Sequence, residues 1–180
     1  MNDDITNNAS FTGRLLALVK LSTDYCLICE NAAEMEKEDF IDRMLDCLPR
    51  LYWEFFDLTS DNVSLVEEGY FSSYLDEDYY ESIRRHIESL LGEDDVFLET
   101  FEEDMKYSDT PIGASIGESL ADIFQPLYNF ISIVKDSEGS QLTEAFIHCK
   151  EEFCDYWSQT LCNVLRALNH LKYSDRTNIV

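Results

Sequence analysis

The chain has 180 residues, of which 45% are hydrophobic and 13% aromatic, and its formal net charge is −24. This composition fits one domain with a continuous core, and the negative charge disfavours general binding to DNA or RNA because it repels phosphate backbones. Six Gly and three Pro are few for a protein built from tight turns, which disfavours a β-sandwich or a β-barrel. We therefore expect an all-α protein, a single-domain irregular helical bundle of about five to seven helices.

Residues 1–9 are polar and are expected to form a flexible N-terminus, followed by a helical domain at 10–172 and a flexible C-terminus at 173–180. The N-terminal segment has neither a basic region nor an apolar run, so it does not resemble a secretory signal. No apolar stretch approaches the roughly 20 residues that span a bilayer. The six cysteines are therefore expected to be free thiols in a reducing cytoplasm.

Apolar residues at spacings of three and four predict two helices in the N-terminal third of the chain. The first is expected to begin at a Ser10 cap and to end near Asn31. The second is predicted over residues 37–58 and contains Pro49. Because proline removes an amide hydrogen bond and clashes with the preceding turn, this helix should kink or break there.

Three further helices are predicted along the remainder of the chain. One begins at an Asp76 cap and ends at Gly92, a residue suited to a left-handed C-terminal cap. The next stretch, 93–101, is ambiguous between a short helix and an extended segment. Another helix is expected to open at Thr110 and Pro111, because proline suits the first helical turn. The last, over residues 141–171, carries an apolar stripe about 45 Å long and should form the spine of the bundle.

Half of the net charge lies in residues 67–109, where fifteen Asp or Glu stand against two Arg and one Lys. Eight aromatic residues lie in the same segment, which should therefore fold, since disordered acidic segments are poor in aromatics. We expect it to present an acidic surface that binds a basic protein or a cationic ligand, without a cofactor or catalysis. The alternative is a solubilising face around a few core aromatics. The candidate residues of this surface are Asp94, Asp95, Phe97, Glu99, Tyr107 and Asp109.

Arg166 and His170 lie four residues apart and support an alternative, enzymatic hypothesis. The pair resembles, one residue too short, the Arg-x(4 to 6)-His motif of helical HEPN-type ribonucleases. That resemblance implies that the histidine would act on the 2′-hydroxyl and that the arginine would steady the phosphate. The non-catalytic interpretation is a surface pair that complements the dipole at the helix C-terminus.

Three other motifs match catalytic or metal sites only in part. Gly113, Ser115 and Gly117 fit the G-x-S-x-G pattern, but no strand is predicted before them, so close helix packing at small residues explains them better. Residues 57–68 have the oxygen spacing of a calcium loop without its central glycine. Cys26 and Cys29 lie on an amphipathic helix, where cysteine behaves as a small buried hydrophobe. We therefore expect no metal site.

Several segments after residue 75 carry a resemblance that is independent of these chemical motifs. They are residues 90–99, 106–109, 114–115, 120–124 and 163–168, together with Trp157. In these segments the chain resembles a bacterial family known only as domain of unknown function 5063. The resemblance implies a compact helical fold with no established activity, cofactor or partner.

Overall fold

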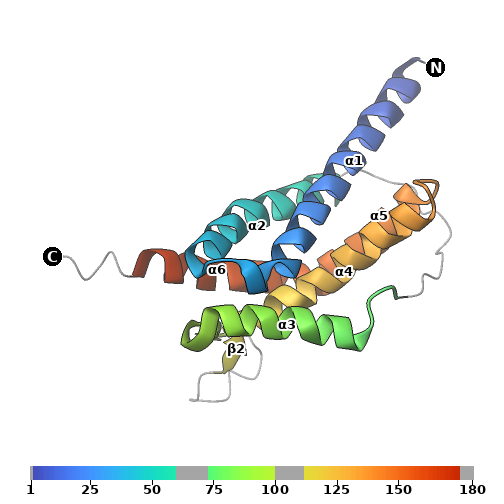
Figure 1. Ribbon diagram of the computed structural model, residues 1–180. Helices are drawn as coiled ribbons and strands as arrows, with labels where there is room; N and C mark the ends of the chain where they lie inside the picture. Colours follow the sequence, from blue (N-terminus) through green and yellow to red (C-terminus); the bar gives the residue numbers. More distant parts are fainter. Residues whose placement is uncertain (1, 60–72, 100–111, 175–180) are drawn as a thin grey trace.

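The computed structural model describes residues 2–59, 73–99 and 112–174, and the periodic apolar spacing of the sequence appears in it as six α-helices. Two three-residue strands, two short 3-10 turns and one π turn connect or interrupt the helices. The all-α, single-domain helical fold is thereby confirmed (Figure 1). The elements are α1 (Asn2–Glu30), η1 (Ala32–Glu34), α2 (Lys37–Thr59), α3 (Glu77–Leu91), η2 (Gly92–Asp95), β1 (Val96–Leu98), β2 (Gly113–Ser115), α4 (Ile116–Asp136), α5 (Leu142–Glu152), the π turn η4 (Phe153–Trp157) and α6 (Ser158–Ser174).

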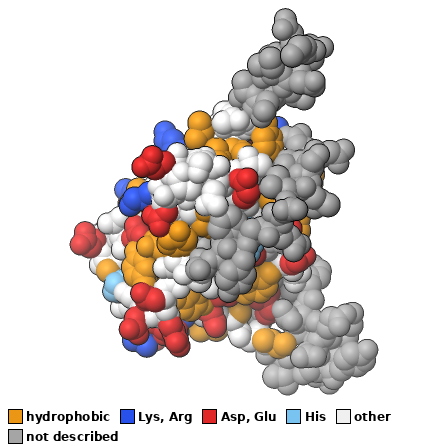
Figure 2. All heavy atoms as spheres, turned by 90° about the vertical axis from the view of Figure 1, so that its right-hand side faces the viewer, with side chains coloured by type: hydrophobic (Ala, Val, Ile, Leu, Met, Phe, Trp, Pro, Cys, Tyr) orange, Lys and Arg blue, Asp and Glu red, His pale blue; other side chains and the backbone are white. Residues whose placement is uncertain are grey.

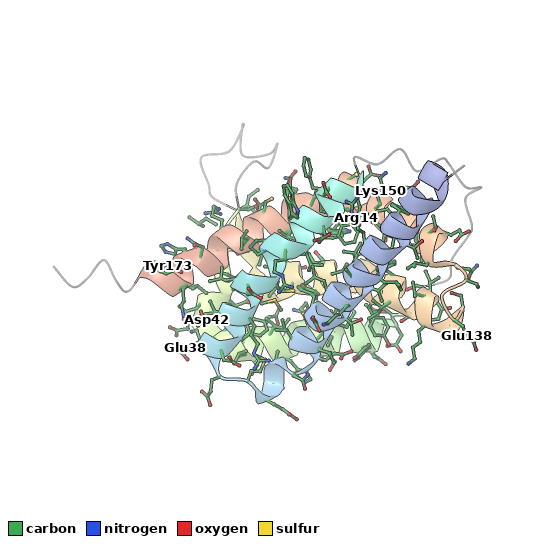
Figure 3. The ribbon with its side chains drawn as sticks, turned by 90° about the horizontal axis from the view of Figure 1, so that it is seen from above. Arg14, Glu38, Asp42, Glu138, Lys150 and Tyr173 are labelled. Carbon is green, nitrogen blue, oxygen red and sulfur yellow. The ribbon has the colours of Figure 1, made fainter. Side chains whose placement is uncertain are left out.

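Helix α4 lies at the centre of the bundle, where it contacts α1, α3, α5 and α6. Helix α2 lies between α1 and α6, as the view from above shows (Figure 3). The core between these helices is rich in aromatic side chains. Phe55 of α2 packs edge-on against Trp157 with 4.7 Å between ring centroids. Burial of such large side chains supplies the main driving force for a bundle of this kind.

The predicted limits of α3 are confirmed at both ends. The Asp76 side chain accepts a hydrogen bond from the amide of Tyr79 at 2.8 Å, as a helix N-cap does. Gly92 has φ of 61°, a value that glycine tolerates best, and it follows the last residue of the helix. Local sequence signals are sufficient here, because both caps act on their own helix.

Two predictions about the first helices differ from the structure. Helix α1 begins at Asn2, so the backbone of residues 2–9 is already helical and Ser10 lies inside the helix instead of capping it. Helix α2 continues through Pro49, so of the kink or break expected there the break does not occur, and this proline is exposed. Water can satisfy the carbonyl group that a proline leaves unpaired on an exposed helix face. The flexible ends expected at 1–9 and 173–180 remain predictions.

Helix α4 does not open at Thr110 and Pro111, which lie outside the described residues. It begins at Ile116, and the Ser115 hydroxyl caps it by accepting from the Glu118 amide at 3.0 Å. The sequence contained this signal, because a serine followed three residues later by a glutamate is the pattern of a capping box. Proline is tolerated in a first helical turn but does not itself start a helix, so the Ser115 cap sets the start of α4.

The structure describes only some of the residues whose spacing partly resembles that of a metal site. Residues 57–68 lie mostly outside the described part of the chain. All six cysteines are free, and Cys26 and Cys29 are buried. Among the described residues, no group of three or more His, Cys, Asp or Glu side chains is placed to hold a metal ion. None of the helices described in the structure has the length and apolar character of a membrane span.

Candidate functional site

Strands β1 and β2 form a short hairpin. Strand β1 lies within the acidic segment, residues 67–109, and strand β2 leads directly into α4. The strands are antiparallel with Val96 opposite Ser115 and Leu98 opposite Gly113, and the Glu99 amide extends the pairing by donating to the Ile112 carbonyl at 2.9 Å. Backbone pairing therefore places Val96 next to the start of α4 and Glu99 opposite Ile112, at the other end of the paired strands.

Helix α6 holds the end of this hairpin with two side chains one turn apart. The Asn163 amide donates to the Glu99 carboxylate at 2.6 Å, and the Arg166 guanidinium donates to the Leu98 carbonyl at 2.7 Å. The Arg166 guanidinium also lies 6.0 Å from the centre of the Phe97 ring. These contacts fix one part of the acidic segment against a regular helix.

An acidic cleft opens between this hairpin end, the start of α4 and the π turn. Its volume is about 370 Å³. Four carboxylates line it, and the described lining residues include no Lys, Arg or His. The cleft is lined by Glu99, Ala114, Ser115, Glu118, Ser119, Asp122, Asp155, Tyr156, Gln159, Thr160 and Asn163.

Two tyrosines hold the Asp122 carboxylate in place. The Tyr80 phenol donates to Asp122 Oδ1 at 2.6 Å, and the Tyr156 phenol donates to Asp122 Oδ2 at 2.7 Å. Burial and these hydrogen bonds raise the pKa of Tyr156 to about 12 and raise the pKa of Tyr80 as well. Both phenols are therefore protonated hydrogen-bond donors at neutral pH, and neither serves as a base there.

The G-x-S-x-G segment has a structural role beside this cleft. Ser115 is itself the last residue of strand β2, and most of the stretch before the motif, where no strand is predicted, lies outside the described residues; the serine hydroxyl caps α4. An ideal Cβ on Gly117 would lie 2.7 Å from Glu88 Cγ and 3.1 Å from the Arg84 carbonyl oxygen. The glycine thus allows α3 and α4 to approach closely, as expected from small residues.

The four predicted surface residues that the structure describes do not form one patch. Asp94 is exposed and forms an ion pair with Lys37. Asp95 is buried and accepts the Gly117 amide at 2.8 Å, so its role is structural and it is not part of an exposed surface. Phe97 is half-buried under Arg166, and Glu99 lines the acidic cleft. Tyr107 and Asp109 lie outside the described residues.

Apart from Glu99, the carboxylates that line the cleft are not identifiable from the sequence. Glu118 and Asp122 come from α4, and Asp155 comes from the π turn, so no local motif connects them. On the face drawn in Figure 2, acidic side chains are spread among hydrophobic ones. The density of charge along the chain or on that face therefore does not locate the cleft.

Arg166 and His170 do not meet in this cleft. Arg166 lines a separate, mainly apolar groove of about 500 Å³ between α2 and α6, where its neighbours include Leu45, Pro49 and Tyr173. His170 is exposed and is not among the residues that line the groove. The arginine of the predicted ribonuclease pair is thus in contact with the hairpin through the Leu98 carbonyl.

Comparison with known proteins gives the family of the chain. The model of the family DUF5063, described as a domain of unknown function, matches residues 9–174. The chain belongs to this family. The match includes the N-terminal helices, whereas the segments that carried the resemblance all lie after residue 75.

A solved structure with a similar fold is the crystal structure of protein BF1032 from Bacteroides fragilis. It is 27% identical, the similarity covers 89% of this chain and 93% of that chain, and the TM-score is 0.75. A search of curated proteins found no match. The family and the fold are therefore established, and the DUF5063 description assigns no activity.

Proposed function

We propose that this DUF5063 protein is a non-catalytic binding module whose acidic cleft takes up a cationic group of a basic protein, such as an arginine side chain. The observation that carries the proposal is the lining of the cleft. Four carboxylates face a volume of about 370 Å³, and no basic side chain is among the described lining residues. This volume falls within the range of roughly 300–1,000 Å³ that is typical of ligand sites.

The chemistry of the lining suits an organic cation. A carboxylate accepts two parallel hydrogen bonds from a guanidinium, and an aromatic ring such as that of Tyr156 attracts a cation to its face. Asp122 is already oriented by two phenols, so less order is lost when a ligand arrives. The net charge of −24 would accelerate the approach of a basic partner.

The side chains that line the cleft suit binding better than catalysis. The phenols of Tyr80 and Tyr156 remain protonated at neutral pH, and no histidine or cysteine is among the described residues that line the cleft. We further propose a cytoplasmic location, which is supported by the free state of all six cysteines.

The test measures binding of a fluorescein-labelled hexa-arginine peptide by fluorescence anisotropy. Because any polycation is attracted to a protein of this charge, two variants with equal loss of charge are compared. One neutralises the cleft, with Glu99→Gln, Glu118→Gln and Asp155→Asn. The matched control, Glu36→Gln with Glu138→Gln and Glu151→Gln, neutralises three exposed carboxylates that do not line the cleft. Glu138 lies in the turn between α4 and α5, at the opposite end of the bundle from Tyr173 (Figure 3).

The cleft variant should lose at least about tenfold in affinity, because charge-assisted hydrogen bonds contribute roughly 1.5–3 kcal/mol each. The control variant should change affinity by less than about threefold, since exposed charges are screened beyond about 10 Å at 0.1 M salt. Equal losses in the two variants would show that the peptide follows the overall charge, and would reject the cleft as the site.

A parallel assay of RNA cleavage tests the ribonuclease alternative. Purified protein is incubated with a single-stranded RNA oligonucleotide, with His170→Ala as the comparison. The binding proposal predicts intact RNA in both samples. Cleavage that is lost in the His170→Ala variant would instead favour the ribonuclease that the Arg166 and His170 pair suggests.

A further inference from the structure

The apolar stripe of the last helix contains a spacing that a continuous α-helix does not accommodate. Cys149, Phe153, Trp157 and Leu161 are each four residues apart, so they span twelve residues over three turns. Three α-helical turns contain about 10.8 residues, so an unbroken α-helix would place Leu161 about 120° away from Cys149. All four side chains are nevertheless buried in the core.

The π turn at Phe153–Trp157 absorbs this excess. The Ser158 amide donates to the Phe153 carbonyl, five residues earlier, where an α-helix would use the fourth. A single π turn is equivalent to one extra residue in an α-helix, and such turns are frequent at functional sites. The helices on either side therefore remain in phase with the core.

The extra residue displaces side chains on the outer face of the turn. Asp155 and Tyr156 are exposed and line the acidic cleft, and the Tyr156 phenol reaches Asp122 on α4. Trp157, the last residue of the turn, is fully buried, and its indole N–H has no hydrogen-bond partner among the described residues. An unsatisfied buried donor is unfavourable and calls for an explanation in a native structure.

We propose that the π turn is the positioning element of the acidic cleft: its extra residue turns Asp155 and Tyr156 toward α4 while α5 and α6 keep their contacts with the core. This inference rests on the proposed function only for the identity of the ligand. Its structural part, the orientation of Asp155 and Tyr156, rests on the geometry of the turn alone. In a continuous α-helix, the Tyr156 phenol would no longer reach Asp122, and the cleft would lose two of its lining side chains.

The decisive experiment compares two variants, each of which lacks one exposed cysteine of the continuous helix formed by α5, the π turn and α6. Deletion of Cys154, within the π turn, should convert the turn to α-helix and leave the protein folded. Deletion of Cys162, within the regular helix α6, should rotate the residues after it by about 100° and strongly lower the melting temperature. Equal destabilisation by the two deletions would overturn the proposal that the turn holds an extra residue.

The positioning role has a spectroscopic readout that needs no ligand. Tyrosine labelled with ¹³C at the ring Cζ reports each phenol titration by NMR, and Tyr156→Phe identifies the signal of Tyr156. In the wild type this phenol should titrate near the pKa of about 12 that burial and Asp122 produce. Deletion of Cys154 should return it toward the ordinary value of about 10. An unchanged titration would contradict the inference.

Hexa-arginine binding then separates this inference from the proposed function. The wild type should bind, whereas the Cys154 deletion and the Asp155→Asn, Tyr156→Phe double variant should each lose at least about fivefold in affinity. Peptide binding that is unaffected by the deletion would reject the positioning role while leaving the cleft proposal intact. A wild type that does not bind would reject the cleft proposal, and the deletion pair and the tyrosine titration would still decide the role of the turn.

Discussion

The phenol of Tyr156 donates a hydrogen bond to the carboxylate of Asp122 at 2.7 Å and so joins the π turn to the N-terminal part of α4. The other oxygen of Asp122 accepts from Tyr80 of α3 at 2.6 Å. A single carboxylate therefore connects three separate elements of the bundle at one wall of the acidic cleft.

Replacing Asp122 by alanine should destabilise the protein by about 1–3 kcal/mol, because the partly buried phenol of Tyr80 and the exposed phenol of Tyr156 both lose their acceptor. Asp24→Ala, at an exposed position on α1, serves as the control and should change stability by less than about 0.5 kcal/mol. Urea unfolding followed by circular dichroism measures both. Equal stability of the two variants would mean that Asp122 does not connect the three elements.

Gly117→Ala should destabilise the protein by about 1–3 kcal/mol, because the added Cβ meets atoms that cannot yield easily. It would lie 3.0 Å from the Glu88 amide nitrogen and 3.1 Å from the Arg84 carbonyl oxygen, both in the backbone of α3. Gly13, in α1, has nothing within 4 Å of the same added atom. Gly13→Ala should therefore be neutral or stabilising by up to about 1 kcal/mol in thermal melts. A higher melting temperature for Gly117→Ala would show that the two helices are further apart.

Asp95→Ala should cost about 1–3 kcal/mol, since it leaves the buried Gly117 amide without an acceptor. The neighbouring Asp94→Ala removes only an exposed ion pair with Lys37, and should cost less than about 1 kcal/mol. Chemical denaturation of the two variants compares a structural carboxylate with a surface one. The reverse order of stability would restore Asp95 as a candidate for an exposed binding surface.

The six thiols should divide into two classes. Burial raises the pKa of Cys47 to about 12 and also raises the pKa values of Cys26, Cys29 and Cys149. Mass spectrometry after iodoacetamide treatment at pH 8 should therefore detect alkylation only at the exposed Cys154 and Cys162, and at all six cysteines in urea.

The same thiols predict how stability depends on pH. Above about pH 8.5 the thiols of the unfolded chain lose their protons, whereas the buried thiols of the folded chain retain theirs. The free energy of unfolding should therefore fall as the pH rises from about 8 to about 10. Rapid alkylation of Cys26 or Cys29 in the native protein would contradict this burial.

The elements that the sequence predicts well are those whose signals act locally. The apolar periodicity of α2 and the caps of α3 at Asp76 and Gly92 each depend on residues within one helix. The start of α4 is predicted less well, because Pro111 and Ser115 both carry helix-start signals and only the Ser115 cap marks the first residue of the helix. The π turn also has a local signal, three consecutive four-residue spacings, but these closely resemble the ordinary periodicity of an α-helix.

The sequence predicts the cleft only in part, because the carboxylates of the cleft come from three separate stretches of the chain. Glu99 was among the candidates on account of local charge density, but so was Asp95, which the fold buries against Gly117. Asp122 and Asp155 lie in amphipathic helical segments, where an isolated carboxylate looks like any solvated residue. Only the packing of α4 against α6 and the turn before it brings them together.

The most direct test of the acidic cleft is its location by NMR. Amide chemical shifts of ¹⁵N-labelled protein are followed during titration with hexa-arginine at about 0.15 M salt, where long-range attraction is largely screened. The largest shifts should fall on Glu99, Glu118, Asp122, Asp155 and Tyr156, and they should disappear in the variant with a neutralised cleft. Shifts spread over the acidic surface, or concentrated at Arg166 and His170, would contradict the cleft as the binding site.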